Sequence, residues 1–213
     1  MIDMDSQLRA ARGIAKNETL ASLEVFQTLK RRGHPDAPPP TISDGWGGIR
    51  EAMVEVYGIV PDYSGHGRPP TRKRPGEGWQ YLQVIKRHDE QGHFQGVKLR
   101  TVFGKKADLL ALLGHSTAYI ERDHLTSRLF NGRQVRQTLA FSKSLEAYRD
   151  SAVWEDSYYN LVRLHQGLRL LAGDVPGTKW LPRTPAMAAH LTDHIWTVKE
   201  LLTALPLLSA TFY

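Results

Sequence analysis

The sequence predicts an α/β protein, with a mixed β-sheet flanked by helices and a helical extension at its C-terminal end. The run Thr41-Ile42-Ser43 is typical of a short buried strand. From Trp79 to Phe103, apolar and polar residues alternate around a turn at Gln91-Gly92, which predicts a two-stranded hairpin. Apolar residues at helical spacing before and after these segments predict the flanking helices.

Composition narrows the class of protein. The chain has 213 residues, of which 41% are hydrophobic, enough for a real core. It contains no cysteine, which excludes disulfides, zinc ribbons and cysteine nucleophiles. No apolar run reaches the length of a membrane span, and we expect a cytoplasmic protein. The net charge of +6 favours a polyanionic partner.

The N-terminal half is expected to begin with a short strand, a turn near Asp5-Ser6 and a second strand near residues 8–15. Thr19 is predicted to cap a helix that ends at Gly33. A proline-rich connector leads to the strand at 41–43, and a glycine turn leads from there into a helix at about 49–57.

In the C-terminal half we expect helices at 105–113, within 116–143, and from Ser142 to about residue 166. The buried side of the third of these should carry Leu145, Tyr148, Ala152, Tyr159 and Val162. Residues 167–182 are predicted to be an irregular connector. Thr184-Pro185 should open a short helix through Leu191, followed by a last helix at about 193–205.

Glu121 is the first candidate for a functional carboxylate. At about 100° per helical residue, Glu121 and Arg128 project within roughly 20° of each other. Ala118, Leu125 and Leu129 form an adjoining apolar stripe that is expected to pack against a sheet. The acid lies among many basic residues, which suits a metal-ligating carboxylate in a phosphate-binding groove. A solvated helix with ordinary ion pairs is the alternative.

Asp44 is the second candidate, because it directly follows the strand at 41–43 and precedes glycines. This is the edge at which open α/β sheets bind ligands. The alternative is that Asp44 caps the following helix.

Basic residues gather in two regions that suit contacts to a nucleic-acid backbone. One is the loop and hairpin at about 60–104, and the other follows Glu121; the alternative is a solvated surface of a mildly basic protein. The candidate DNA-binding residues are Arg68, Arg72, Lys73, Arg74, Lys86, Arg87, Arg128, Arg133, Arg136 and Lys143.

Three stretches carry a resemblance to a known family: SDGWGGIREAMVEVYG, TAYIERDHLTSRLFNGRQVRQTLAFSK, and YYNLVRLHQGLR followed by RTPAMAAHLTDHIWTVKELL. Together they resemble bacterial insertion-sequence transposases with an integrase-type, ribonuclease H-like DDE catalytic core. The resemblance implies such a core over residues 1–141 and a helical extension over 142–213. It also implies that Asp44 and Glu121 are the second and third catalytic, metal-ligating acids, and that Arg128 contacts DNA.

The chain departs from the family pattern in two ways. Leu164 replaces the proline of the YNxxRPH pattern. The first acid of the triad is not evident, since Asp3 resembles the structural acid at the end of the family's second strand. We therefore expect the first strand, its aspartate and any preceding DNA-binding domain to be missing.

The resemblance implies Mg²⁺-dependent DNA cleavage and 3′-OH strand transfer, with Mn²⁺ as a substitute ion and transposon ends and target DNA as partners. It also implies association with the bacterial nucleoid, and self-association is left open. The alternative is a catalytically dead remnant that binds DNA and competes with transposition. A ribonuclease H-like nuclease unrelated to mobile DNA is disfavoured, since that chemistry needs neither YYNLVR nor TPAMAAHLTDHIW.

Overall fold

The computed structural model describes residues 1–135, 138–173, 177 and 179–209. The chain divides into two compact units, and each is considered by itself. The N-terminal unit comprises Ala11–Ala118; the C-terminal unit comprises Met1–Ala10 together with Tyr119–Tyr213. The division expected between residues 141 and 142 stays a prediction. None of the helices in the described part of the chain has the length and apolar character of a membrane-spanning segment.

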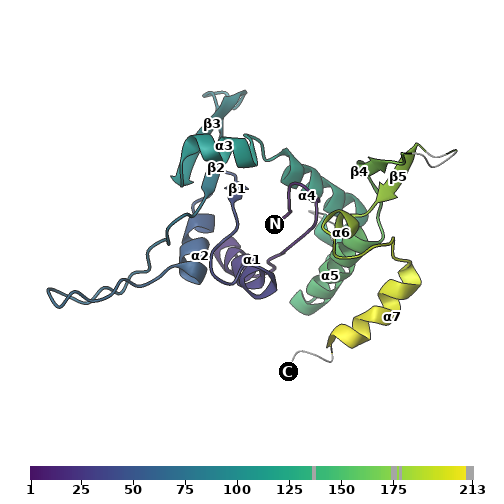
Figure 1. Cartoon of the computed structure of the whole chain (residues 1–213), viewed down its shortest axis with the longest axis horizontal. Helices are drawn as coiled ribbons and strands as arrows, with labels where there is room; N and C mark the ends of the chain where they lie inside the picture. The colour runs from purple at the N-terminus through teal and green to yellow at the C-terminus, as the bar shows by residue number, and fades with distance from the viewer. Residues whose placement is uncertain (136–137, 174–176, 178, 210–213) are drawn as a thin grey trace. The chain divides into compact units, whose positions relative to one another are not determined.

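The N-terminal unit contains a three-stranded mixed sheet in the order β1-β2-β3 (Figure 1). Strand β1 (Thr41–Ser43) pairs in parallel with β2 (Tyr81–His88), starting at the pair Thr41 and Tyr81. Strand β2 pairs antiparallel with β3 (Phe94–Phe103), across the predicted turn. A mixed sheet accompanied by helices is therefore confirmed.

Three helices belong to this unit: α1 (Glu18–Arg32), α2 (Gly48–Tyr57) and α3 (Lys106–Leu113). The predicted cap of α1 is wrong by two residues, because the Asn17 side chain accepts the hydrogen bond from the backbone N–H of Leu20 while Thr19 lies within the helix. Edge-to-face aromatic contacts link Phe26 of α1 to Tyr57 of α2, Tyr57 to Trp79, and Trp79 to Phe103. This aromatic chain joins both helices to the sheet.

The C-terminal unit begins with a tight turn rather than two full strands. A single antiparallel bridge joins Ile2 to Arg9. Between them, the Asp3 carboxylate accepts hydrogen bonds from the backbone N–H and the hydroxyl of Ser6. Asp3 thus stabilises this turn.

Helix α4 (Ala118–Phe130) ends well before Lys143, and a 3₁₀ turn follows at Gly132–Gln134. The apolar stripe predicted as its packing face is exposed within this unit, with Leu125 and Leu129 at 56% and 73%. The buried residues of α4 are the polar Asp123 and Ser127 instead. A buried polar network, described below, reverses the orientation that the apolar stripe suggests.

Helix α5 (Leu145–Leu161) is capped by Ser144 rather than Ser142, because the Ser144 hydroxyl accepts from the backbone N–H of Ala147. On its predicted buried side, Ala152 and Tyr159 are buried but Leu145 is 44% exposed.

The segment predicted to be irregular instead forms a two-stranded antiparallel sheet of β4 (His165–Leu171) and β5 (Trp180–Arg183). Thr184 caps α6 (Pro185–Ala188) as predicted, although this helix is shorter than expected. The last helix, α7 (Val198–Ser209), starts later than expected.

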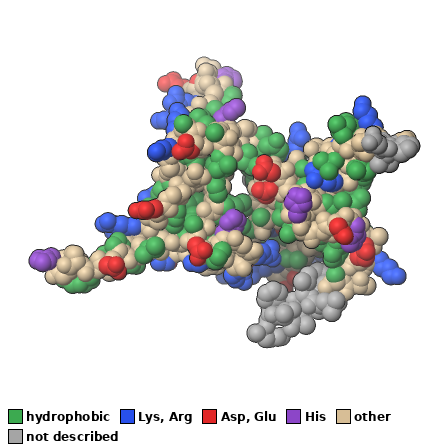
Figure 2. Space-filling model, in the orientation of Figure 1, with side chains coloured by type: hydrophobic (Ala, Val, Ile, Leu, Met, Phe, Trp, Pro, Cys, Tyr) green, Lys and Arg blue, Asp and Glu red, His purple; other side chains and the backbone are tan. Residues whose placement is uncertain are grey.

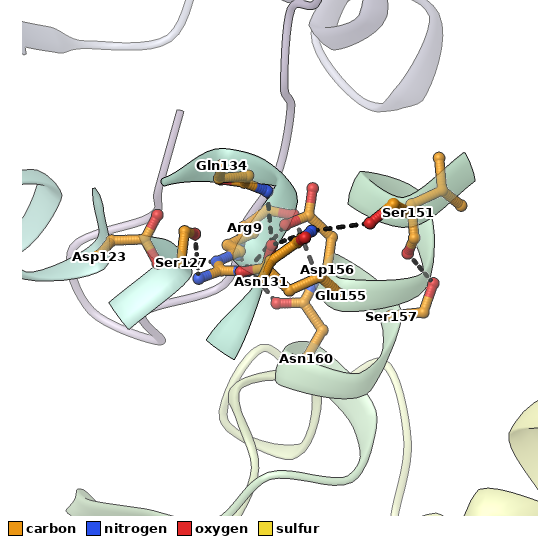
Figure 3. A network of polar contacts seen from close by, with 11 residues as sticks. Arg9, Asp123, Ser127, Asn131, Gln134, Ser151, Glu155, Asp156, Ser157 and Asn160 are labelled. Carbon is orange, nitrogen blue, oxygen red and sulfur yellow. Dashed lines mark hydrogen bonds and ion pairs between the residues drawn. The ribbon is translucent and has the colours of Figure 1, made fainter. Parts of the chain in front are cut away.

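Arg9 is the polar centre of the C-terminal unit, with a side chain only 4% exposed (Figure 3). Its Nε lies 2.7 Å from Asp123 Oδ1 of α4, and its Nη1 lies 2.7 Å from Glu155 Oε1 and 2.9 Å from Asp156 Oδ1 of α5. Its Nη2 donates to the Ser127 hydroxyl at 2.8 Å. Burial works to lower the pKa of Arg9, but the charges and hydrogen bonds of Asp123 and Glu155 outweigh it, so the net shift is upward.

Further hydrogen bonds hold the Glu155 carboxylate in place. Glu155 Oε2 accepts from the side-chain amides of Asn131, at 3.3 Å, and Gln134, at 2.6 Å. Asn131 also donates to the Ser151 hydroxyl at 2.9 Å. These bonds tie the segment after α4 to the middle of α5 (Figure 3).

Replacing Arg9 should destabilise this unit severely. Arg9→Ala leaves three carboxylates clustered without their cation, and the expected loss in the free energy of unfolding is about 3–5 kcal/mol. Urea unfolding followed by circular dichroism would measure it. Arg122→Ala is the matched control, since Arg122 is an exposed arginine of α4, and its cost should stay below about 0.5 kcal/mol. Equal losses in the two variants would contradict the central role of Arg9.

Candidate functional site

Asp44 lies directly after β1, and its carboxylate is exposed. Its Oδ1 accepts from the backbone N–H of Trp46 at 3.2 Å. Helix α2 has Gly47 at its N-cap position and no side-chain cap bond. The alternative reading of Asp44 as a helix cap is therefore wrong, and the carboxylate stabilises the turn that leaves the strand.

A buried hydrogen-bond network fixes the strand end that carries Asp44. The Ser43 hydroxyl donates to the Asp44 backbone carbonyl and lies 2.8 Å from the Tyr81 hydroxyl. The Gln83 amide donates to the Tyr81 hydroxyl at 2.8 Å and to the Trp46 carbonyl at 3.0 Å. Arg100 of β3 donates from Nε to Gln83 Oε1 at 2.8 Å. Burial raises the pKa of Tyr81, so this hydroxyl stays protonated and able to donate.

The glycine turn after Asp44 has a packing reason. A Cβ at Gly48 would come within 2.2 Å of the Trp46 ring. A side chain there would displace Trp46, whose backbone bonds both Asp44 and Gln83. The sequence pattern of strand, acid and glycines thus encodes a defined turn.

Glu121 lies in the first turn of α4 and is exposed. It belongs to the C-terminal unit, whereas Asp44 belongs to the N-terminal unit. A shared catalytic site requires the two carboxylates to meet in space, and this stays a prediction.

Among the described residues, no group of three or more His, Cys, Asp or Glu side chains is arranged to hold a metal ion. The donor chemistry of Asp44 and Glu121 nevertheless suits Mg²⁺, which takes few protein oxygens and completes its shell with water and phosphate. That these two carboxylates hold such an ion stays a prediction.

The basic candidates of the N-terminal unit differ in their surroundings. Lys73 forms an ion pair with Glu55 at 2.7 Å and also donates to the Glu55 backbone carbonyl, so its charge is engaged. The backbone of Arg74 bridges to Ile59 and ties down the base of the loop. Arg68, Arg72, Arg74, Lys86 and Arg87 are exposed. On the face seen in Figure 2, Lys and Arg side chains are interspersed with Asp and Glu.

In the C-terminal unit, Arg128 and Lys143 are exposed, and the exposed Arg133 donates to the Ser142 hydroxyl at 3.0 Å. Arg136 lies outside the described residues. The role of these basic residues in DNA binding also stays a prediction.

The YYNLVRLH stretch anchors the N-terminal segment. The Asn160 side chain accepts from the backbone N–H of Arg9 at 3.0 Å and donates to its carbonyl at 3.1 Å. The Tyr159 ring lies under the Arg9 guanidinium, 3.9 Å from ring centroid to Cζ, and His165 packs edge-on against the same ring. Leu164, in place of the family's proline, is 49% exposed and takes no part in these contacts. The sequence offered no signal for Arg9 itself, whose partners lie more than a hundred positions away.

Comparisons with protein-family models, with curated proteins and with solved structures found no match for this chain. The resemblance to insertion-sequence transposases therefore rests on the motifs quoted above alone.

His165 should make stability depend on pH. Its Nε2 is buried without a hydrogen-bond partner among the described residues, and burial, aided by the charges of Arg163 and Arg9, lowers its pKa to about 4. In the unfolded chain the His165 ring binds a proton near its ordinary pKa of about 6.5, whereas in the folded chain it resists protonation. The stability of the folded state is therefore unaffected by His165 above about pH 6.5 and decreases as the pH falls from there toward 4. By pH 5 the loss is at most about 2 kcal/mol, since the ring is partly exposed.

His165→Phe should remove that part of the pH dependence. Melting temperatures between pH 7 and 5 would measure it, and the exposed His66→Gln is the control. A variant that loses as much stability as the wild type over this range would show that His165 titrates normally.

Proposed function

We propose that the chain is the catalytic region of a DNA transposase with a ribonuclease H-like core, acting in Mg²⁺-dependent DNA cleavage and 3′-OH strand transfer. The observation that carries the proposal is the position of Asp44, at the carboxyl end of β1. This strand is parallel to β2, and ligands of open sheets bind beyond the carboxyl ends of such strands. The exposed carboxylate is held on a rigid turn, as a metal ligand must be.

The residues have distinct proposed roles. Asp44 and Glu121 would hold Mg²⁺, whose charge would activate the attacking oxygen and stabilise the leaving oxygen in a displacement at phosphorus. Arg128 lies two turns after Glu121 on the same helix and binds a DNA phosphate. The exposed basic residues of the loop and hairpin bind the DNA backbone and position it.

A second candidate function is DNA binding without catalysis. Exposed cations in each unit favour it, because they bind phosphates whether or not Asp44 and Glu121 meet. Such a protein would compete with an active transposase for its DNA.

Joining of a labelled transposon end to target DNA separates the two functions. If the chain is catalytic, Asp44→Asn and Glu121→Gln should each lower the Mg²⁺-dependent rate at least about a thousandfold, because each removes a ligand that acts on the transition state. DNA affinity should change little. The matched controls are Asp62→Asn, an exposed loop acid, and Glu146→Gln, an exposed acid in the first turn of α5.

Joining that survives both substitutions would overturn the assignment of these two acids. The first acid of the triad is not evident in this chain, so DNA binding with no joining favours the second candidate only if a chain supplied with a first strand and its aspartate also fails to join DNA.

Affinity for duplex DNA should fall steeply with salt. If about five phosphates are contacted, the logarithm of the affinity should fall with the logarithm of salt concentration at a slope of about −4 to −5. Arg128→Ala should make this slope shallower by about 0.9. Arg169→Ala, which removes an arginine held over Trp180, should leave the slope unchanged. Fluorescence anisotropy at several salt concentrations measures the slope for each variant. A flat dependence would exclude DNA as the partner.

A further inference from the structure

A groove in the C-terminal unit brings two of the candidate DNA-binding residues, Arg133 and Lys143, together with a set of exposed aromatic rings. It is formed by the segment after α4, by one face of α5 and by the start of α7, and its volume is about 920 Å³. That volume falls within the range of about 300–1,000 Å³ typical of ligand sites. Its floor along α5 is built from residues at helical spacing, small at Ala147 and Ser151 and aromatic at Trp154 and Tyr158.

Four aromatic side chains line this groove: Phe130, Phe141, Trp154 and Tyr158. Phe130 and Phe141 are 65% and 61% exposed, and Trp154 and Tyr158 are 37% and 39% exposed. Rings this accessible can stack with a flat ligand. Arg163, which does not line the groove, lies with its Cζ 4.4 Å from the centroid of the Phe130 ring and helps to hold it in place.

The charge of the groove favours an anionic ligand. Arg133 and Lys143 line it and are exposed. Among the described residues of the lining, Glu155 is the single acid, and its oxygens are already engaged by Arg9, Asn131 and Gln134. The two cations therefore dominate the accessible surface.

We propose that this groove binds unpaired nucleotides of single-stranded DNA. The bases stack on Trp154, Tyr158 and the phenylalanines, while Arg133 and Lys143 bind the adjoining phosphates. Aromatic rings set within a basic groove are the means by which proteins hold single strands without reading their sequence. The inference rests on the proposed function only in taking DNA as the ligand.

The test compares two fluorescent oligomers of equal length and charge. One is an oligothymidylate of eight nucleotides, and the other has the same backbone with an abasic site at every position. The ratio of their affinities for one variant isolates stacking, because phosphate contacts cancel. The unaltered chain should prefer the oligothymidylate by about 5- to 150-fold per stacked base.

Trp154→Ala and Phe141→Ala should each reduce this preference several-fold, while Arg133→Ala should weaken both oligomers alike. Val153→Ala is the control, because Val153 is an exposed neighbour on α5 that does not line the groove. Phe141 is so exposed that its replacement should not unfold the chain, which melting curves would check.

Equal affinity of the unaltered chain for both oligomers would overturn the inference, as would a preference that survives both aromatic substitutions. A groove that serves a protein partner would give the first of these results. Duplex binding and strand transfer are measured separately from this preference. Steep salt dependence on duplex DNA, together with equal affinity for the oligothymidylate and the abasic oligomer, would refute this inference and leave the proposed function unaffected.

Discussion

The C-terminal unit depends on the burial of one guanidinium among three carboxylates. Arg9 reaches Asp123 on α4 and both Glu155 and Asp156 on α5, and Asn160 bonds its backbone on both sides. Charges removed from water are costly unless all are paired, so the four groups stabilise the fold only together. The first ten residues carry a single β-bridge, and this network rather than a sheet attaches them to the helices.

The same network determines which side of α4 faces outward. Asp123 and Ser127 are four residues apart, on one face, and both bind Arg9. Glu121 and Leu125 each lie two residues from Asp123, about 200° around the helix, so both must point away from it. The exposure of Glu121 and of the apolar stripe thus has one cause. Asp123, which the sequence pattern places on a polar and therefore solvent-exposed face, is buried and sets the orientation of Glu121.

Local sequence patterns predict many of the helices and strands. They do not predict features that depend on polar contacts between residues far apart in the sequence. Strand β1, the hairpin, α2 and the Thr184 cap follow from alternation, glycine turns and capping chemistry within a few residues. The face of α4 could not be predicted, since it depends on an arginine 114 positions away in sequence. Likewise β4 and β5 are mostly exposed, with Leu168 the buried residue of β4, so neither strand carries an alternating pattern of apolar residues. Asp44 was identifiable from strand, acid and glycines alone, but its support by Tyr81, Gln83 and Arg100 was not.

Both candidate catalytic acids are therefore placed by buried polar networks, each confined to its own unit. The turn at Asp44 is fixed through Trp46, Gln83 and Arg100, and the helix face at Glu121 is fixed through Asp123 and Arg9. Neither network needs the other unit to form. Within each unit the orientation of the carboxylate therefore depends on contacts of that unit alone.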